Sequence, residues 1–172
     1  MLCLSGTLLD RPVLSLRSGG PVAVVEAPIF NPHNLKIEGF YVRDTVDKQT
    51  FILLYQDIRE FSRQGYIVDD HDVLAQPDDL VRLKDILALH FELLKKPVET
   101  TSKEQLGRVT DYATETTTMY VQKLYVSRSF LKNLTGGSLS IDRTQIAEVT
   151  NRRIVVNELL QGTPSPATAA AA

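Results

Sequence analysis

The sequence repeats itself at a spacing of about 85 residues, and this repeat constrains the fold more than any other feature. The stretch "RPVLSLRSGGPVAVVEAPIF", followed by "LKIEGFYV", aligns with "KPVETTSKEQLGRVTDYATE", followed by "YVQKLYV". Pro12 aligns with Pro97, and after a one-residue slip Val25 aligns with Val109. Solenoid repeats are much shorter than this. The pattern therefore indicates a small domain that is duplicated in tandem.

The alignment continues into the last part of each copy. There "IVDDHDVLA" matches "SIDRTQIAE", which places Asp69 on Asp142. The spacing has fallen to 73 residues at this point. This match predicts that the first copy contains additional residues, within residues 56–64.

Short strand-like segments separated by turn residues fill most of the first copy. Runs rich in β-branched and aromatic residues are bounded by Gly, Pro, Asn and Asp. The predicted strands cover residues 12–16, 22–30, 35–42, 50–55 and 65–69. Strands this short and closely spaced are typical of a small barrel or sandwich. We therefore expect a mainly β fold of two small antiparallel β-barrels in tandem.

Two segments break the strand pattern. Residues 77–91 place Leu80, Leu83 and Leu87 at helical spacing, after aspartates that can cap a helix. Because "LVRL" also alternates, a strand is the alternative for part of this segment. The polar residues 56–64 are compatible with one or two helical turns. We expect short helical connectors at these positions.

These patterns divide the chain into four parts. Residues 1–76 form the first barrel-like domain, residues 77–91 a connector, and residues 92–160 the second barrel-like domain. Residues 161–172 are proline- and alanine-rich, which predicts a disordered tail. Each domain is near the lower size limit for independent folding, so we expect the two to pack against each other.

The second copy resembles a known family. "KPVETTSKEQLGRVTDYATETTTMYVQKLYV", followed by "GGSLSIDRTQIAEVTNRRIVV", is similar to a PRC-barrel domain. The shared pattern is a Pro-Val start, a "GRV" step into a strand, an "LYV" strand, and an "IDRTQI" segment before a final "RRIVV" strand. The first copy resembles the same family, with Ala23 where the second copy has Gly107. The resemblance covers roughly residues 4–158.

The resemblance implies a fold and a class of function. The family is named for the cytoplasmic domain of the photosynthetic reaction centre H subunit, and it includes the C-terminal domain of a ribosome maturation factor. Its members are mostly interaction modules. The chain shows neither the transmembrane helix of the former protein nor the N-terminal domain of the latter. The resemblance thus implies a non-catalytic protein–protein interaction or scaffolding module, with an RNA- or ribosome-associated maturation factor as the alternative.

Composition narrows the choice of partner and location. The net charge of −2 and pI of about 5.9 give no general attraction to nucleic acid or anionic lipid, and the basic pairs Lys95-Lys96 and Arg152-Arg153 are small. Cys3 is the only cysteine, so no intramolecular disulfide can form. No signal peptide and no apolar run of ~20 residues is visible. We expect a cytoplasmic protein without membrane insertion.

The sequence offers no catalytic, cofactor or metal site that outweighs a structural explanation. The densest polar cluster is "DDHD", at residues 69–72. Its aligned counterpart, residues 142–145, keeps only the first acid, which favours a turn or a helix cap over a metal site. His33 and His90 have no histidine counterpart and no visible nucleophile to activate. We therefore predict no enzyme, no cofactor and no bound metal.

The candidate interface consists of apolar residues near the ends of two matching strands: Phe40, Val42, Leu124 and Val126. Because side chains alternate across a strand, these strand ends are apolar on both faces. Such surfaces are covered by the other copy, by a second protomer in a homo-oligomer, or by a partner protein. Packing of copy against copy is the favoured explanation, and a ribosomal or RNA partner is less favoured than a protein.

Overall fold

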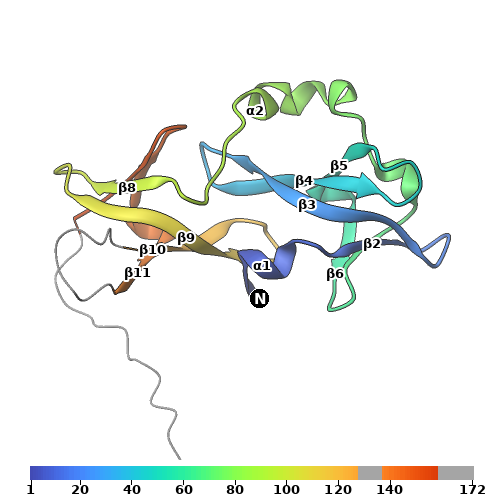
Figure 1. Ribbon diagram of the computed structural model, residues 1–172, viewed down its shortest axis with the longest axis horizontal. Helices are drawn as coiled ribbons and strands as arrows, with labels where there is room; N and C mark the ends of the chain where they lie inside the picture. The colour runs from blue at the N-terminus through green and yellow to red at the C-terminus, as the bar shows by residue number, and fades with distance from the viewer. Residues whose placement is uncertain (128–136, 159–172) are drawn as a thin grey trace, which may run out of the picture.

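The computed structural model describes residues 1–127 and 137–158, and its fold is mainly β. Two sheets lie side by side along the long axis of the molecule (Figure 1). One of them curls into a half-barrel. No helix in the part of the chain that is described is long and apolar enough to cross a membrane. The predicted disordered tail, residues 161–172, lies outside the described residues.

The first sheet is built from the first half of the chain. Its strands are β2 (Pro12–Ser15), β3 (Pro21–Asn31), β4 (Lys36–Asp44), β5 (Thr50–Leu54), β6 (Ile58–Phe61) and β7 (Tyr66–Val68). Their spatial order is β5-β4-β3-β2-β7-β6. Neighbouring strands are antiparallel, except that β2 and β7 are parallel. The five predicted strands of this half are confirmed, and β6 is added to them.

The second sheet repeats this arrangement strand for strand. Its strands are β8 (Pro97–Thr100), β9 (Gln105–Glu115), β10 (Val121–Ser127), β11 (Ser138–Asp142), β12 (Ile146–Val149) and β13 (Ile154–Val156). Their order is β11-β10-β9-β8-β13-β12, and β8 and β13 form the parallel pair. Order and strand direction therefore match those of the first sheet.

A short N-terminal strand crosses from the first half to the second sheet. β1 (Leu2–Leu4) pairs antiparallel with β9, and the single-turn helix α1 (Ser5–Leu8) follows it. Cys3 faces Thr114 in this pair and is buried, as expected of a small hydrophobe. A strand from residues 1–76, the first half of the chain, is therefore part of the second sheet.

Strand register corrects the alignment of the last part of the repeat. Phe40 pairs with Leu53, and Leu124 pairs with Ile141 in the same way. "TFILLYQDIREF" therefore corresponds to "SLSIDRTQIAEV", and the predicted match of Asp69 with Asp142 is wrong. The two segments that the sequence alignment matched each contain an apolar residue followed by Asp. A match of two residues is too short to fix the alignment. The additional residues therefore belong to the second half of the chain, where they lie between β10 and β11. They are not in residues 56–64 of the first half.

Residues 56–64 also differ from the predicted helical turns. A 3-10 turn, η1 (Tyr55–Asp57), leads directly into β6. Its counterpart is η5 (Arg143–Gln145), which starts with a capping box. The Asp142 carboxylate accepts the Thr144 N–H at 3.1 Å, and the Gln145 side chain accepts the Asp142 N–H at 2.7 Å. The expected capping role of Asp142 is therefore confirmed.

The connector is a mixture of short helical pieces. It contains η3 (Pro77–Asp79), η4 (Val81–Leu83) and α2 (Lys84–Ala88), after an earlier turn, η2 (His71–Val73). Leu80 adopts φ −95° and ψ 70°, outside the helical region, which separates η3 from η4. The predicted helix is thus confirmed only in its later part. In Figure 1 the connector (green) arches beside the first sheet and returns to β8.

The two sheets meet around an approximate two-fold relation. The Ile37 N–H donates to the Met119 carbonyl at 2.8 Å, and the Val121 N–H donates to the Leu35 carbonyl at 3.0 Å. Ile37 and Val121 occupy matching positions at the starts of β4 and β10, and so do Leu35 and Met119. A two-fold rotation that exchanges the two sheets therefore also exchanges these two hydrogen bonds. The bridge between Lys36 and Tyr120 lies at the centre of this relation.

A second pair of matching segments contributes one buried leucine from each half. "LLDRPV" in the first half and "LLKKPV" in the second half place a leucine in the core, since Leu8 is 0% exposed and Leu93 is 1% exposed. Each segment then bonds to the long strand of its own sheet, with Asp10 N–H donating to Val25 and Lys95 N–H donating to Val109. The buried apolar residues of both halves form one continuous core.

Candidate functional site

The four predicted interface residues lie in the core and not on the surface. Phe40, Val42, Leu124 and Val126 are all 0% exposed. Phe40 is covered by a residue of its own sheet, since its ring lies 5.0 Å from the ring of Tyr66 in β7. The chain itself therefore covers the doubly apolar strand ends, and a partner has to contact other residues.

The acidic cluster at residues 69–72 divides into separate pairs. Asp69 accepts two hydrogen bonds from the guanidinium of Arg59, at 2.8 and 2.6 Å. Asp70 pairs with Arg17 at 3.1 Å. Within residues 1–127 and 137–158, no three His, Cys, Asp or Glu side chains are grouped so as to hold a metal ion. The cluster ties the loop after β7 to neighbouring strands.

The most buried charge of this loop region is Asp44, at the end of β4. Asp44 is 3% exposed and accepts the N–H groups of Val46 at 2.6 Å and Asp47 at 3.1 Å. His71 Nε2 also contacts its carboxylate. The hydrogen bond from His71, followed by those from the two backbone N–H groups, lowers the pKa of Asp44 and outweighs the opposite effect of burial.

Replacing Asp44 should make stability depend on pH in a defined direction. Because folding lowers the pKa of Asp44, the carboxylate stabilises the fold above its unfolded pKa of about 3.9 and loses this effect as the pH falls through the folded value. Asp44→Asn should therefore lower the free energy of unfolding by about 1–3 kcal/mol at pH 7 and by less at pH 3. Urea unfolding at the two pH values measures the difference.

The matched control for this prediction is Asp72→Asn. Asp72 is exposed and forms no hydrogen bond to another described residue, so its replacement should change stability by less than about 0.5 kcal/mol at either pH. Equal losses for Asp44→Asn at pH 7 and pH 3 would contradict the assigned role of the charge.

The two other histidines and the first basic pair, Lys95-Lys96, occupy positions that a structural role explains. His33 and His90 are exposed in turns, and His90 has φ 44°. Lys96 is largely buried, with Nζ donating to the Asn151 carbonyl at 2.7 Å and lying 4.4 Å from the centre of the Phe91 ring. Burial lowers the pKa of Lys96. This lysine anchors a turn and does not contribute to an exposed basic patch.

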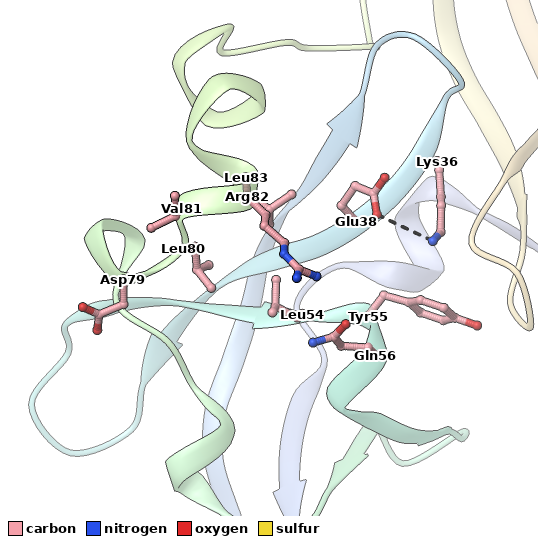
Figure 2. Close-up of a pocket in the computed structure, with 10 residues that line it drawn as sticks. All are labelled: Lys36, Glu38, Leu54, Tyr55, Gln56, Asp79, Leu80, Val81, Arg82 and Leu83. Atoms are coloured by element: carbon pink, nitrogen blue, oxygen red, sulfur yellow. Dashed lines mark ion pairs between the residues drawn. The ribbon is translucent and has the colours of Figure 1, made fainter.

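A groove of about 520 Å³ lies between the connector and the neighbouring ends of β4 and β5 (Figure 2). Ten residues line it: Lys36, Glu38, Leu54, Tyr55, Gln56, Asp79, Leu80, Val81, Arg82 and Leu83. They come from the edge of the first sheet, from η1 and from η3 and η4 of the connector. Leu80 lines the groove at the point where it separates η3 from η4.

The groove combines an apolar lining with charged groups. Leu54, Leu80 and Leu83 supply apolar surface and are all half-buried. At one end, Lys36 Nζ lies 3.6 Å from the Glu38 carboxylate. The other carboxylate oxygen of Glu38 accepts a hydrogen bond from the Asn31 amide at 3.2 Å. The charge of Glu38 is therefore balanced within the protein.

Among the described lining residues, Arg82 is the cationic group that lacks such a balance. Figure 2 shows its guanidinium pointing into the groove toward Leu54 and Tyr55, whereas Val81 and Asp79 point away. Among residues 1–127 and 137–158, Arg82 forms no ion pair and no hydrogen bond through its side chain. An exposed guanidinium of this kind is available to a carboxylate on a ligand.

A row of alternating aromatic and cationic side chains extends the groove across the junction. Lys36 Nζ lies 5.2 Å from the centre of the Tyr55 ring and 6.0 Å from that of Tyr120. The Arg143 guanidinium lies 4.7 Å from the centre of the Tyr120 ring. Cations at these distances are attracted to the ring faces. The row therefore fixes one end of the groove to the second sheet.

Hydrogen bonds across the junction hold this row in place. Arg143 donates to the Asn34 carbonyl at 2.6 Å and to the Val121 carbonyl at 3.0 Å. The Tyr55 hydroxyl donates to the Thr117 carbonyl. Tyr55 and Arg143 start the matching turns η1 and η5, so each sheet sends one side chain to the backbone of the other. The groove is thus attached to a rigid support.

Sequence reasoning missed this groove for a physical reason. Its residues come from strand ends and from a connector whose path depends on Leu80, and no short motif joins them. One signal was present: aligning "LKIEGFYV" with "YVQKLYV" places Lys36 opposite Tyr120 in the repeat. Residues at matching positions meet when two copies pack around a two-fold relation.

Comparison with known proteins adds no identity to these observations. No family model matches the chain, and no curated protein matches it significantly.

Proposed function

We propose that this chain is a non-catalytic protein-binding or scaffolding module built from two PRC-barrel copies, and that the groove beside the connector is its binding surface. The two copies are supported by the shared strand order, by the parallel pairs β2–β7 and β8–β13, and by the reciprocal hydrogen bonds at the junction. The sequence resemblance to the PRC-barrel family supports the same assignment.

The observation that carries the binding role is the composition of the groove. Its three leucines remain partly exposed beside an unpaired guanidinium, on a support that is bonded to both sheets. Partly apolar grooves with a few polar groups are typical of ligand and peptide sites. The described lining residues include no serine, cysteine or histidine, so the commonest nucleophiles and the commonest general base are missing from them. This lining supports binding over catalysis.

An RNA- or ribosome-associated role is the second candidate, and the row of Lys36, Tyr55, Tyr120 and Arg143 is the observation that favours it. Aromatic and basic side chains together bind single-stranded RNA. Both tyrosines, however, already face cations, and the net charge of the chain is −2. The occupied ring faces and the negative net charge favour a protein partner.

A displayed library of random 12-residue peptides tests the proposed function. Peptides selected on the full chain should bind the Leu80→Asp variant at least about 10-fold more weakly, because the new carboxylate makes the apolar lining polar. Val46→Asp is the matched control: Val46 is 88% exposed in the β4–β5 turn, so this variant should bind normally. Circular dichroism checks that both variants are folded.

The proposed function fails if the selected peptides bind Leu80→Asp and the parent chain equally well. It fails also if a folded chain selects no peptide above background.

A further inference from the structure

We propose that the groove recognises an extended peptide segment whose acidic side chain pairs with Arg82, an inference that rests on the proposed function and specifies its ligand. The uncompensated charge inside the groove is positive, because Glu38 is paired with Lys36 at 3.6 Å and with Asn31 at 3.2 Å. Asp79 points away from the groove interior in Figure 2. A ligand carboxylate therefore meets attraction at Arg82 and no unbalanced negative charge beside it.

The sheet edge next to the groove favours an extended backbone. Ile52 in β5 forms two hydrogen bonds of 2.9 Å with Ala75, so its N–H and carbonyl face away from β4. Strand alternation directs the N–H of Leu54, two residues later, to the same side. Within the described part of the chain, this N–H donates to no backbone group outside the sheet. An extended peptide can therefore continue the edge pairing that Ala75 begins.

The position of Arg82 relative to this edge defines the ligand. The leucines that line the groove accept one or two apolar side chains of the peptide, while the carbonyl groups of the peptide accept the Leu54 N–H. The guanidinium, a planar donor with five N–H groups, suits a carboxylate better than a neutral amide. The expected motif is one Asp or Glu next to apolar residues in a segment without helical structure.

The experiment uses the tightest peptide from the selection and its analogue with each Asp or Glu replaced by Asn or Gln. Fluorescence anisotropy on the full chain should give about 10- to 100-fold weaker binding for the analogue, and for Arg82→Glu with the parent peptide. Arg82→Lys should retain an intermediate affinity. Lys84→Glu is the matched control, because Lys84 is exposed on the same connector but does not line the groove.

The charge reversal and the peptide change should be coupled. Arg82→Glu should strongly weaken binding of the acidic peptide and should not weaken binding of the neutral analogue. This difference would show that both changes remove the same contact. Peptides that depend on Leu80 but lack an acidic residue, or that bind Arg82→Glu unchanged, would overturn the inference and leave the proposed function standing. Displacement of the peptide by an oligouridylate at physiological salt would overturn both in favour of RNA.

Discussion

Phe40→Ala is expected to lower the free energy of unfolding by about 3–5 kcal/mol, one of the largest effects of any single substitution in this chain. Phe40 is 0% exposed and packs 5.0 Å from the Tyr66 ring at the centre of the first sheet. Its truncation leaves a cavity that the curled sheet cannot fill, because strands on both sides hold it in register. Equilibrium urea unfolding measures the loss.

Two further substitutions make this prediction specific. Leu124 occupies the matching position in β10 and is also 0% exposed, so Leu124→Ala should lower stability by about 2–5 kcal/mol. Val46→Ala, at a residue that is 88% exposed, should change it by less than about 0.5 kcal/mol. A loss below about 1 kcal/mol for Phe40→Ala would show that this side chain is not part of the core.

Gly65→Ala is the second substitution with a large expected effect. Gly65 has φ 147°, and a Cβ at this position would overlap the carbonyl oxygen of Pro12. The strand pair β2–β7 would have to separate locally to relieve the overlap, and this pair joins β6 and β7 to the rest of the sheet. We expect a loss of about 3 kcal/mol or more, because backbone strain and a steric clash add. Thermal unfolding followed by circular dichroism measures it.

The matched control is Gly20→Ala. A Cβ on Gly20 meets no atom within 4 Å, so this variant should retain the stability of the parent chain within about 1 kcal/mol. If both alanine variants unfold at the same temperature, the close approach of Gly65 to β2 is not a feature of the protein in solution.

Local patterns predicted much of the fold. Alternating apolar residues and turn residues located five strands of the first sheet, because period-two burial and turn chemistry are local properties. The early part of the alignment between the two halves also agrees with the strand register, since Val25 pairs with Val42 as Val109 pairs with Val126. Residues 56–64 were missed because a 3-10 turn and a short strand give too few residues for a clear period.

Long-range geometry limited the prediction of the site. The apolar ends of β4 and β10 were correctly recognised as surfaces that need cover, but the sequence could not show that the folded chain itself buries Phe40 and Leu124. The leucines of the connector predicted one helix, whereas the backbone angles of Leu80 divide it into separate turns that line the groove. Arg82 is left as the unpaired cation of the groove because Lys36 and Asn31 balance Glu38, and these side chains come from separate strands, which no sequence period encodes.

The pairing of β1 with β9 affects the order in which the protein can fold during synthesis. Contacts at this strand join residues as far as 114 positions apart, from Met1 to Glu115. A ribosome completes the first sheet long before β9 emerges, so β1 waits without its partner while the nascent chain grows. Such sequence-distant pairing slows folding. The final closure of the molecule therefore belongs to a late stage, after both sheets have been translated.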